Sequence, residues 1–181
     1  MNKPVIGISS CLTGNHVRYD AGDKMHRSLL AWLRNDVELI AICPEVAIGM
    51  GIPRPPIELS DDVIHPEARQ VDQPDKIYTM PLKKFGWQVA EEYVLDGYIF
   101  KSRSPSCGLG STTVKINGLI QQRTVSGIYA SSLVTCLPYL PVTEAEALTT
   151  GKDCYHFINK CLEYRNSRLA METVLNISQP Q

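Results

Sequence analysis

Three cysteines of this chain each stand just after a short apolar run, where their thiols could bind a soft metal or take part in catalysis. These are Cys11, Cys43 and Cys107, and the runs before them cover residues 4–10, 37–42 and 97–100. Each run is typical of a buried strand in a parallel sheet. Ligands of such sheets bind outside the carboxyl ends of the strands. The three thiols could therefore converge on one crevice and hold zinc or an iron–sulfur cluster, or they could be three independent buried thiols.

The loop that carries Cys107 is strongly polar. Residues 101–110 include two basic side chains, three serines, one proline and two glycines besides the cysteine. Hydroxyls and cations are costly to bury unless they are satisfied, so such a segment has little use in a core. Its Pro and Gly residues fix a backbone that gathers polar side chains and N–H groups at one place. We therefore expect this loop to form part of a site.

The other three cysteines, Cys136, Cys154 and Cys161, lie on predicted helices and are expected to act as small hydrophobic residues. No C-x-x-C pair occurs, which argues against a zinc ribbon, a thioredoxin-type site and the compact ferredoxin pattern. A disulfide framework is not expected, because a chain of 181 residues can bury a sizeable core. Because the N-terminus also lacks the apolar stretch of a signal peptide, we expect a cytoplasmic protein.

The composition is that of an ordinary globular domain, with 44% hydrophobic residues, 20% charged residues and a net charge of −1. Such a balance creates no overall field that would attract nucleic acid or a membrane surface. No apolar run approaches the roughly 18 residues that a transmembrane helix needs.

The order of the remaining elements predicts how the cysteines are positioned. Strands and helices alternate along the first hundred residues, which predicts an α/β fold: a three-layer Rossmann-like sandwich with a mostly parallel sheet. Asn117-Gly118 predicts the turn of a small added β-hairpin. Short strands are expected around Glu58 and Gln70. The expected helices cover residues 23–35, 76–95, 127–137 and 153–175.

Two local signals concern helix ends. Asp23 is expected to be the N-cap of the first helix, and Thr143 with Glu146 has the spacing of a capping box. We expect residues 1–150 to form the α/β domain and residues 151–181 to form a C-terminal helix and tail packed on that same domain.

Four ordered blocks of the sequence closely resemble the thiouracil desulfidase family, which was formerly catalogued as a domain of unknown function. The resemblance covers about residues 4–145. The blocks are Ser-Ser-Cys-Leu-Thr-Gly at 9–14 with Arg-Tyr-Asp at 18–20, Cys-Pro-Glu at 43–45, Gly-Ile-Pro-Arg-Pro-Pro at 51–56 and Lys-Ser-Arg-Ser-Pro-Ser-Cys-Gly at 101–108.

This resemblance implies a [4Fe-4S] cluster held by Cys11, Cys43 and Cys107, with a fourth iron that has no protein ligand and can take the substrate. It implies removal of sulfur from thiolated pyrimidines such as 2-thiouracil, with C=S replaced by C=O and sulfide released. It also implies that Glu45 and Ser104 are the catalytic residues. An open iron suits soft thiocarbonyl sulfur, Glu45 could activate water, and Ser104 could donate a proton.

Each remaining candidate also has a plainer interpretation. Glu45 could simply cap the following turn, and Ser104 could be an ordinary turn residue before Pro105. Tyr19 could stack on a pyrimidine or could only pack. The basic side chains could orient carbonyl oxygens, attract anionic substrates or touch a phosphate, or they could form a solvated rim; these are Arg18, Arg54, Lys101 and Arg103.

Two other functions stay open at this stage. One is a non-catalytic module that binds zinc or a thiol compound. The other is a desulfidase acting on thiouridine in transfer RNA, although a chain that ends in one helix without an added domain favours a small thiolated base. The sequence does not define the oligomeric state.

Overall fold

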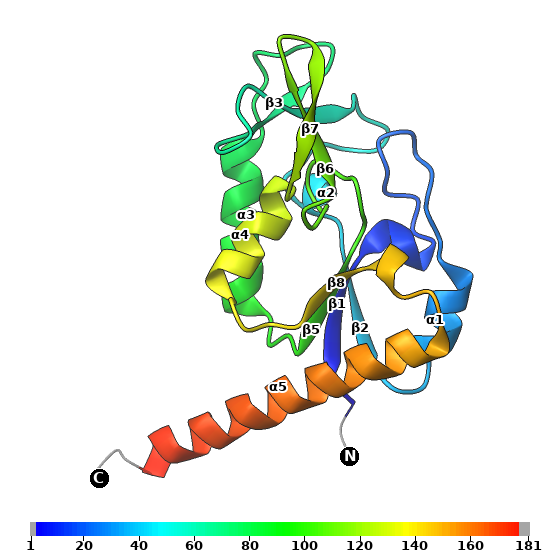
Figure 1. The fold of residues 1–181 in the computed structure, drawn as a ribbon, viewed down its shortest axis with the longest axis vertical. Helices are drawn as coiled ribbons and strands as arrows, with labels where there is room; N and C mark the ends of the chain where they lie inside the picture. Colours follow the sequence, from blue (N-terminus) through cyan, green and yellow to red (C-terminus); the bar gives the residue numbers. More distant parts are fainter. Residues whose placement is uncertain (1–2, 178–181) are drawn as a thin grey trace.

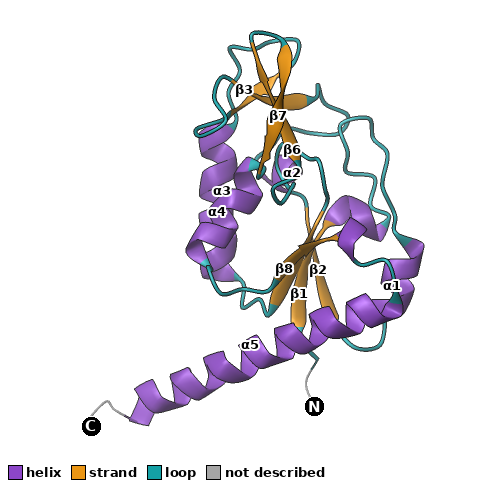
Figure 2. Ribbon diagram, viewed as in Figure 1, coloured by secondary structure: helices purple, strands orange, loops and turns teal. Residues whose placement is uncertain are grey.

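The computed structural model of the chain describes residues 3–177, so the tail predicted beyond Ile177 lies outside the described part. Its centre is a four-stranded, fully parallel sheet in the order β2-β1-β5-β8 (Figure 2). The strands are β1 (Val5–Ser9), β2 (Glu38–Ile42), β5 (Gly97–Phe100) and β8 (Val142–Glu144). The chain leaves β1 for β2 on one side and returns to β5 on the other, so β1 lies at a topological switch point.

Helices cover both faces of this sheet, which confirms the predicted three-layer α/β fold (Figure 1). On one face lie α1 (Arg27–Leu33) and the long α5 (Gly151–Ile177), and on the other lie α3 (Thr79–Glu92) and α4 (Ile128–Cys136). The alternation of side chains along a strand explains how β5 serves both layers. Tyr98 and Phe100 belong to the core under α3 and α4, whereas Ile99 belongs to the core under α1 and α5.

The predicted hairpin is half of a second, four-stranded sheet rather than an isolated addition. The strands β3 (Ile57–Ser60), β4 (Glu67–Gln70), β6 (Thr112–Ile116) and β7 (Leu119–Val125) pair in the order β4-β3-β6-β7. Asn117 and Gly118 have φ values of 50° and 78°, as a tight hairpin turn requires. Leu59 and Val114 belong to the same buried cluster as Tyr98, so this sheet and the α3/α4 side of the main sheet share one core.

The first helix begins later than predicted, because the residues before it are used to hold the turn after β1. Asp23 is not the N-cap: its Oδ1 accepts from the N–H of Met25 in a local turn, and His26 caps α1 instead. The N–H groups of Lys24 and His26 donate to the backbone oxygens of Cys11 and Leu12. Residues 23–26 therefore run along the 3-10 turn that carries Cys11, and they do not join the helix.

The capping box predicted from Thr143 and Glu146 is also wrong. Glu144 precedes a 3-10 turn, Ala145–Ala147, and no side-chain hydrogen bond caps it. The side chain of Glu144 instead accepts from the N–H of Leu109 and from the hydroxyl of Ser111, so it ties the end of β8 to the 101–111 loop.

The C-terminal helix packs on the main sheet through its first half. Phe157, Ile158 and Cys161 lie in the buried cluster beneath α1 and α5, and Cys154 is also buried there. Cys136 is exposed at the end of α4, which corrects the expectation of a core residue at that position. Among the described helices none combines the length and apolar character needed to cross a membrane.

Candidate active site

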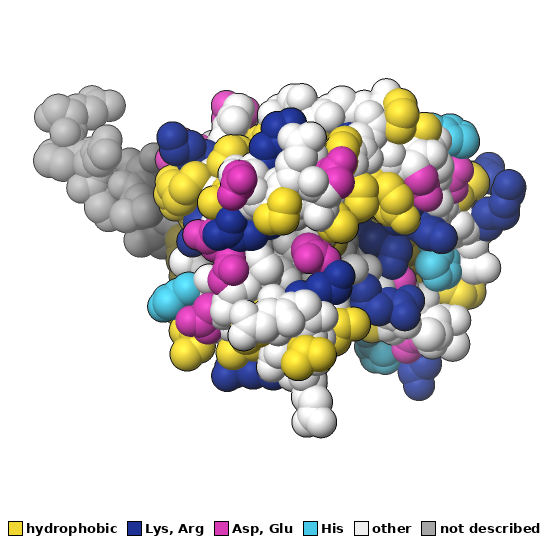
Figure 3. Space-filling model, turned by 90° about the horizontal axis from the view of Figure 1, so that it is seen from above, with side chains coloured by type: hydrophobic (Ala, Val, Ile, Leu, Met, Phe, Trp, Pro, Cys, Tyr) yellow, Lys and Arg dark blue, Asp and Glu magenta, His cyan; other side chains and the backbone are white. Residues whose placement is uncertain are grey.

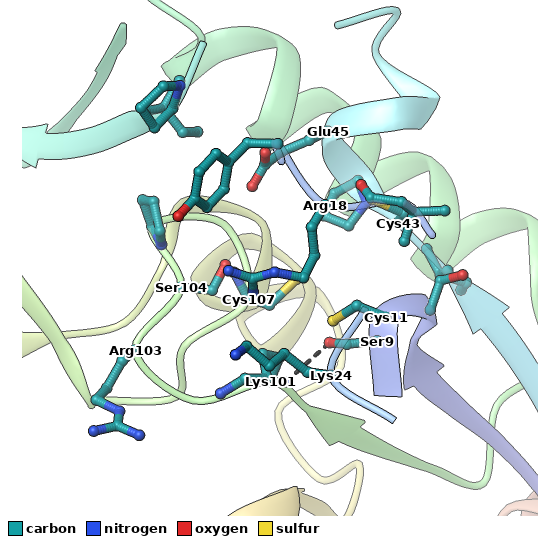
Figure 4. A pocket seen from close by; sticks show the side chains of 18 of the residues that line it. Ser9, Cys11, Arg18, Lys24, Cys43, Glu45, Lys101, Arg103, Ser104 and Cys107 are labelled. Atoms are coloured by element: carbon teal, nitrogen blue, oxygen red, sulfur yellow. Dashed lines mark hydrogen bonds between the residues drawn. The ribbon is translucent and has the colours of Figure 1, made fainter. Parts of the chain in front are cut away.

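A single pocket of about 280 Å³ opens at the carboxyl ends of β1, β2 and β5. Cys11, Cys43 and Cys107 all line it, so the predicted convergence of the three cysteines on one crevice is confirmed (Figure 4). Glu45 and Ser104 line the same pocket. Residues separated by up to 96 positions along the chain (11 to 107) therefore meet because their strands are neighbours in the sheet.

The short turns after β1 and β2 present the first two thiols. Cys11 lies in the 3-10 turn Ser10–Thr13, which ends at Gly14 with φ of 90°, a value that favours glycine. Cys43 is the N-cap residue of the one-turn helix α2 (Pro44–Ala47), with proline at the first helical position where its missing N–H costs nothing. The Cys43 thiol lies 3.7 Å from the backbone oxygen of Val17.

A hydroxyl-centred turn presents the third thiol. The Oγ of Ser104 accepts from the N–H groups of Ser106 at 3.3 Å and Cys107 at 3.1 Å, and the backbone oxygen of Ser104 accepts from Gly108 N. The Ser9 hydroxyl lies against the Cys107 sulfur and also accepts from the N–H of Lys101 at 2.9 Å. Ser9 thus ties the end of β1 to the loop after β5.

Burial dominates the protonation of all three thiols. It raises the pKa of Cys11 to about 11, although the positive charges of Arg18 and Lys101 oppose this rise. Burial also raises the pKa of Cys43, and it raises that of Cys107 well above its ordinary value against the hydrogen bond from Ser9. The three sulfurs are also close enough to affect one another: Cys43 raises the pKa of Cys11, and both Cys43 and Cys11 raise the pKa of Cys107. Burial therefore disfavours the thiolate form of all three groups.

Glu45 is held in the pocket wall by a buried arginine and a buried serine. Arg54 donates to Glu45 Oε2 from both Nε and Nη2 at 2.8 Å, and its Nη1 donates to the backbone oxygen of Gly51 at 2.9 Å. The Arg54 side chain is only 3% exposed. The hydroxyl of Ser106 donates to Glu45 Oε1 at 2.8 Å. The carboxylate is therefore fixed by three donors, two from Arg54 and one from Ser106.

Ser104 has a hydroxyl hydrogen available for a ligand. Its oxygen accepts two backbone N–H groups, while its own hydrogen has no acceptor within residues 3–177. The hydroxyl faces the pocket beside Cys107 (Figure 4).

The predicted basic residues and Tyr19 occupy different parts of the pocket. Lys101 pairs with Glu146 at 2.8 Å and also donates to Ser102. Burial acts to raise the pKa of Glu146, but hydrogen bonds from Lys101 and Ser102 outweigh it and hold that pKa at about 2. Arg103 is exposed and points away from the cysteines, whereas Arg18 reaches into the pocket (Figure 4). Tyr19 lines the pocket and is 42% exposed.

Three residues matter more in the structure than the sequence suggested. Ser9 and Ser106 connect the strand ends to Cys107 and Glu45, and Arg54 supports Glu45 although the sequence placed it among the substrate-binding candidates. The sequence shows that all three lie inside the four blocks that resemble the family, but the partners of their side chains are set by tertiary contacts.

The surface around the second sheet carries both signs of charge. Figure 3 views the molecule from that end and shows Lys and Arg side chains gathered more densely on one half of the face, with acidic side chains interspersed. Within the part of the chain that is described, no group of three or more His, Cys, Asp or Glu side chains has an arrangement suited to a metal ion.

A fully parallel sheet covered by helices, with three thiols, a carboxylate and a hydroxyl lining one pocket at its switch point, defines a Rossmann-like protein with a candidate active site at the strand ends. Comparison with known proteins is consistent with this class. The family model described as 2-thiouracil desulfurase matches residues 6–145. The chain therefore belongs to the 2-thiouracil desulfurase family.

Two known proteins are similar to this chain over most of its length. The uncharacterized protein YbbK of Bacillus subtilis (strain 168) is 28% identical over 131 residues, which cover 68% of this chain and 83% of that protein. A solved structure described as the [4Fe-4S]-dependent thiouracil desulfidase TudS superposes with a TM-score of 0.59 at 24% identity. It covers 82% of this chain and 93% of its own. At that identity the superposition establishes the shared fold.

Proposed function

We propose that this chain is a desulfidase that converts thiolated pyrimidines such as 2-thiouracil to the corresponding oxo-pyrimidines. In the overall reaction water supplies the oxygen, the C=S bond becomes C=O, and sulfur leaves as hydrogen sulfide, so no oxidant or reductant is needed. Family membership supports the reaction class. The observation that carries the proposal is one pocket lined by three thiols, a fixed carboxylate and a hydroxyl with a free hydrogen.

Cys11, Cys43 and Cys107 are donors of the type that an iron–sulfur cluster takes, while the described residues contain no group arranged for a single metal ion. The structural neighbour is described as [4Fe-4S]-dependent. The three cysteines would hold such a cluster through thiolates, which are its usual ligands. Arg18 and Lys101 lie close enough to oppose the rise in the pKa of Cys11, so they would also stabilise an anionic cluster. When bound, the cluster would supply an iron without a protein ligand, which polarises a thiocarbonyl as a Lewis acid.

Glu45 would act as the base that takes a proton from the attacking water. Arg54 and Ser106 fix the carboxylate at the pocket wall and still leave lone pairs on Oε1 for a water molecule. A base held in one orientation loses little entropy when the reaction begins. Arg54 would therefore be a positioning residue for Glu45.

Ser104 would donate its hydroxyl hydrogen to a heteroatom of the pyrimidine ring. The two backbone N–H groups that donate to its oxygen orient the hydroxyl and polarise it toward donation. Lys101, already paired with Glu146, would contribute charge to the pocket rather than a contact of its own. Tyr19 would cover the open side of the pocket with its ring.

Turnover of 2-thiouracil by the anaerobically reconstituted chain tests the proposal. We expect uracil and sulfide in equal amounts, without added reductant. Glu45→Gln should keep the iron content and lose about 10²- to 10⁴-fold in turnover, the usual contribution of a general base. A reconstituted wild-type chain that leaves 2-thiouracil unchanged would contradict the proposed function.

A further inference from the structure

Arg18 has no role in the network that fixes Glu45, yet its side chain enters the same pocket (Figure 4). The other cations of the pocket are engaged elsewhere or lie at its rim. Arg54 donates to Glu45, Lys101 pairs with Glu146, and Arg103 and Lys24 are exposed. The Nε of Arg18 is buried and has no hydrogen-bond partner among the described residues. A buried guanidinium nitrogen without a partner is costly, so a ligand atom that satisfies it would bind favourably.

The neighbours of Arg18 hold its guanidinium in place without using up its donors. The guanidinium carbon lies 5.2 Å from the centroid of the Tyr19 ring, in a cation–π contact. Asp20 Oδ1 lies 3.5 Å from Nε, an ion pair too long to be a good hydrogen bond. The backbone between them is a tight turn in which Ala21 N donates to Arg18 O and Arg18 N to Gly22 O. A planar donor is thus pre-oriented at the pocket wall.

We infer that Arg18 is a specificity-determining residue that recognises the 4-carbonyl oxygen of a 2-thiopyrimidine, which lies across the ring nitrogen N3 from the sulfur-bearing carbon. This inference rests on the proposed function. A guanidinium has only donors, so it can pair with O4 of 2-thiouracil but not with the amino group of 2-thiocytosine, which is also a donor. A site built to hydrogen-bond one substrate group discriminates strongly against an analogue that cannot pair. Arg18 therefore selects 4-oxo over 4-amino thiopyrimidines.

Equilibrium binding of the products tests this without relying on turnover. Uracil and cytosine are titrated calorimetrically into the full chain, both as purified without oxygen and after reconstitution. The wild-type chain should prefer uracil by at least about tenfold. Arg18→Met should weaken uracil binding by about 10- to 100-fold and leave cytosine nearly unchanged, as expected for loss of a charge-assisted hydrogen bond. Arg18→Lys keeps the charge but not the planar fork, so it should restore only part of the preference.

Lys24→Met is the matched control, because it removes a positive charge from the rim of the same pocket. It should leave the ratio of uracil to cytosine affinity unchanged. An Arg18→Met chain that keeps the wild-type ratio, or a wild-type chain that binds both bases equally, would overturn the inference about Arg18. Failure of the wild-type chain to desulfurise 2-thiouracil, with the binding preference intact, would count against the proposed function instead.

Discussion

Replacing Arg54 by methionine tests whether a buried ion pair holds the Glu45 carboxylate. The change removes three donated hydrogen bonds, two to Glu45 Oε2 and one to the backbone oxygen of Gly51, from a side chain that is 3% exposed. The Glu45 carboxylate, whose side chain is 15% exposed, would keep only the hydrogen bond from Ser106.

The expected loss follows from the cost of leaving a buried charge without its partner. Removing one member of a buried ion pair costs about 3–5 kcal/mol of unfolding free energy. For a chain of this length each kcal/mol lowers the midpoint of thermal unfolding by about 2–4 °C. We therefore expect Arg54→Met to unfold about 6–20 °C lower, measured by circular dichroism and checked by urea denaturation with an unchanged slope.

Arg69→Met is the control for this prediction. Arg69 also makes two ion pairs, with Asp61 at 2.7 Å and Glu67 at 2.6 Å, but its partners are 52% and 39% exposed. Exposed pairs contribute at most about 1 kcal/mol. The reasoning is refuted if Arg54→Met costs no more than Arg69→Met. The double variant Glu45→Gln/Arg54→Met should recover part of the loss, because no unpaired charge remains in it.

Three further predictions address the loop and its neighbours. Ser104→Ala should lower turnover per bound iron by at least about 10²-fold, through loss of a proton donor; turnover is normalised to iron content because Ser104 Oγ also accepts from the N–H of Cys107. Gly127→Ala should cost about 1–3 kcal/mol of unfolding free energy, since a Cβ there would lie 2.5 Å from a backbone carbon of the Cys107 loop; Gly151→Ala, where the nearest atom is 3.5 Å away, should be nearly neutral. Glu146→Gln should destabilise the chain at pH 7 by at most about 1 kcal/mol, because the Glu146 side chain that pairs with Lys101 is 43% exposed.

The pH dependence of the last variant has a defined sign. The Glu146 pKa falls from 4.5 to about 2 on folding, so its stabilising effect is complete above pH 4.5 and disappears as the pH falls toward 2. The stability difference between wild type and Glu146→Gln should therefore shrink over that interval. A difference that grows below pH 4.5 would contradict the assigned pairing. Unchanged turnover in Ser104→Ala, or equal stability of the two glycine variants, would contradict the other two predictions.

The strand ends that carry the cysteines could be predicted because local patterns determine them. A short apolar, β-branched run such as residues 4–10 is typical of a buried strand in a parallel sheet. Residues that follow such strands meet at the edge formed by the carboxyl ends of the strands. The hairpin turn was predictable for the same reason, since Asn117-Gly118 adopts the required positive φ values at little cost.

Features that depend on distant partners could not be read from local patterns. Residues 23–26 have helical spacing, but backbone hydrogen bonds to the turn around Cys11 keep them extended. The parallel pairing of β3 with β6 joins segments about 55 residues apart, so the hairpin gave no sign of a second sheet. The contacts of Arg54 and Ser106 with Glu45 likewise span 9 and 61 positions. The sequence shows that these residues are polar, but their hydrogen-bond partners depend on the tertiary structure.

The iron and sulfide content of four single variants, reconstituted without oxygen, tests the central claim most directly. The wild-type chain should hold about four irons and four sulfides. Cys11→Ser, Cys43→Ser and Cys107→Ser should each lose most of them, while Cys136→Ser, whose thiol is exposed outside the pocket, should match the wild type. A full cluster in any of the three pocket variants, or its loss in Cys136→Ser, would contradict the assignment of the ligands.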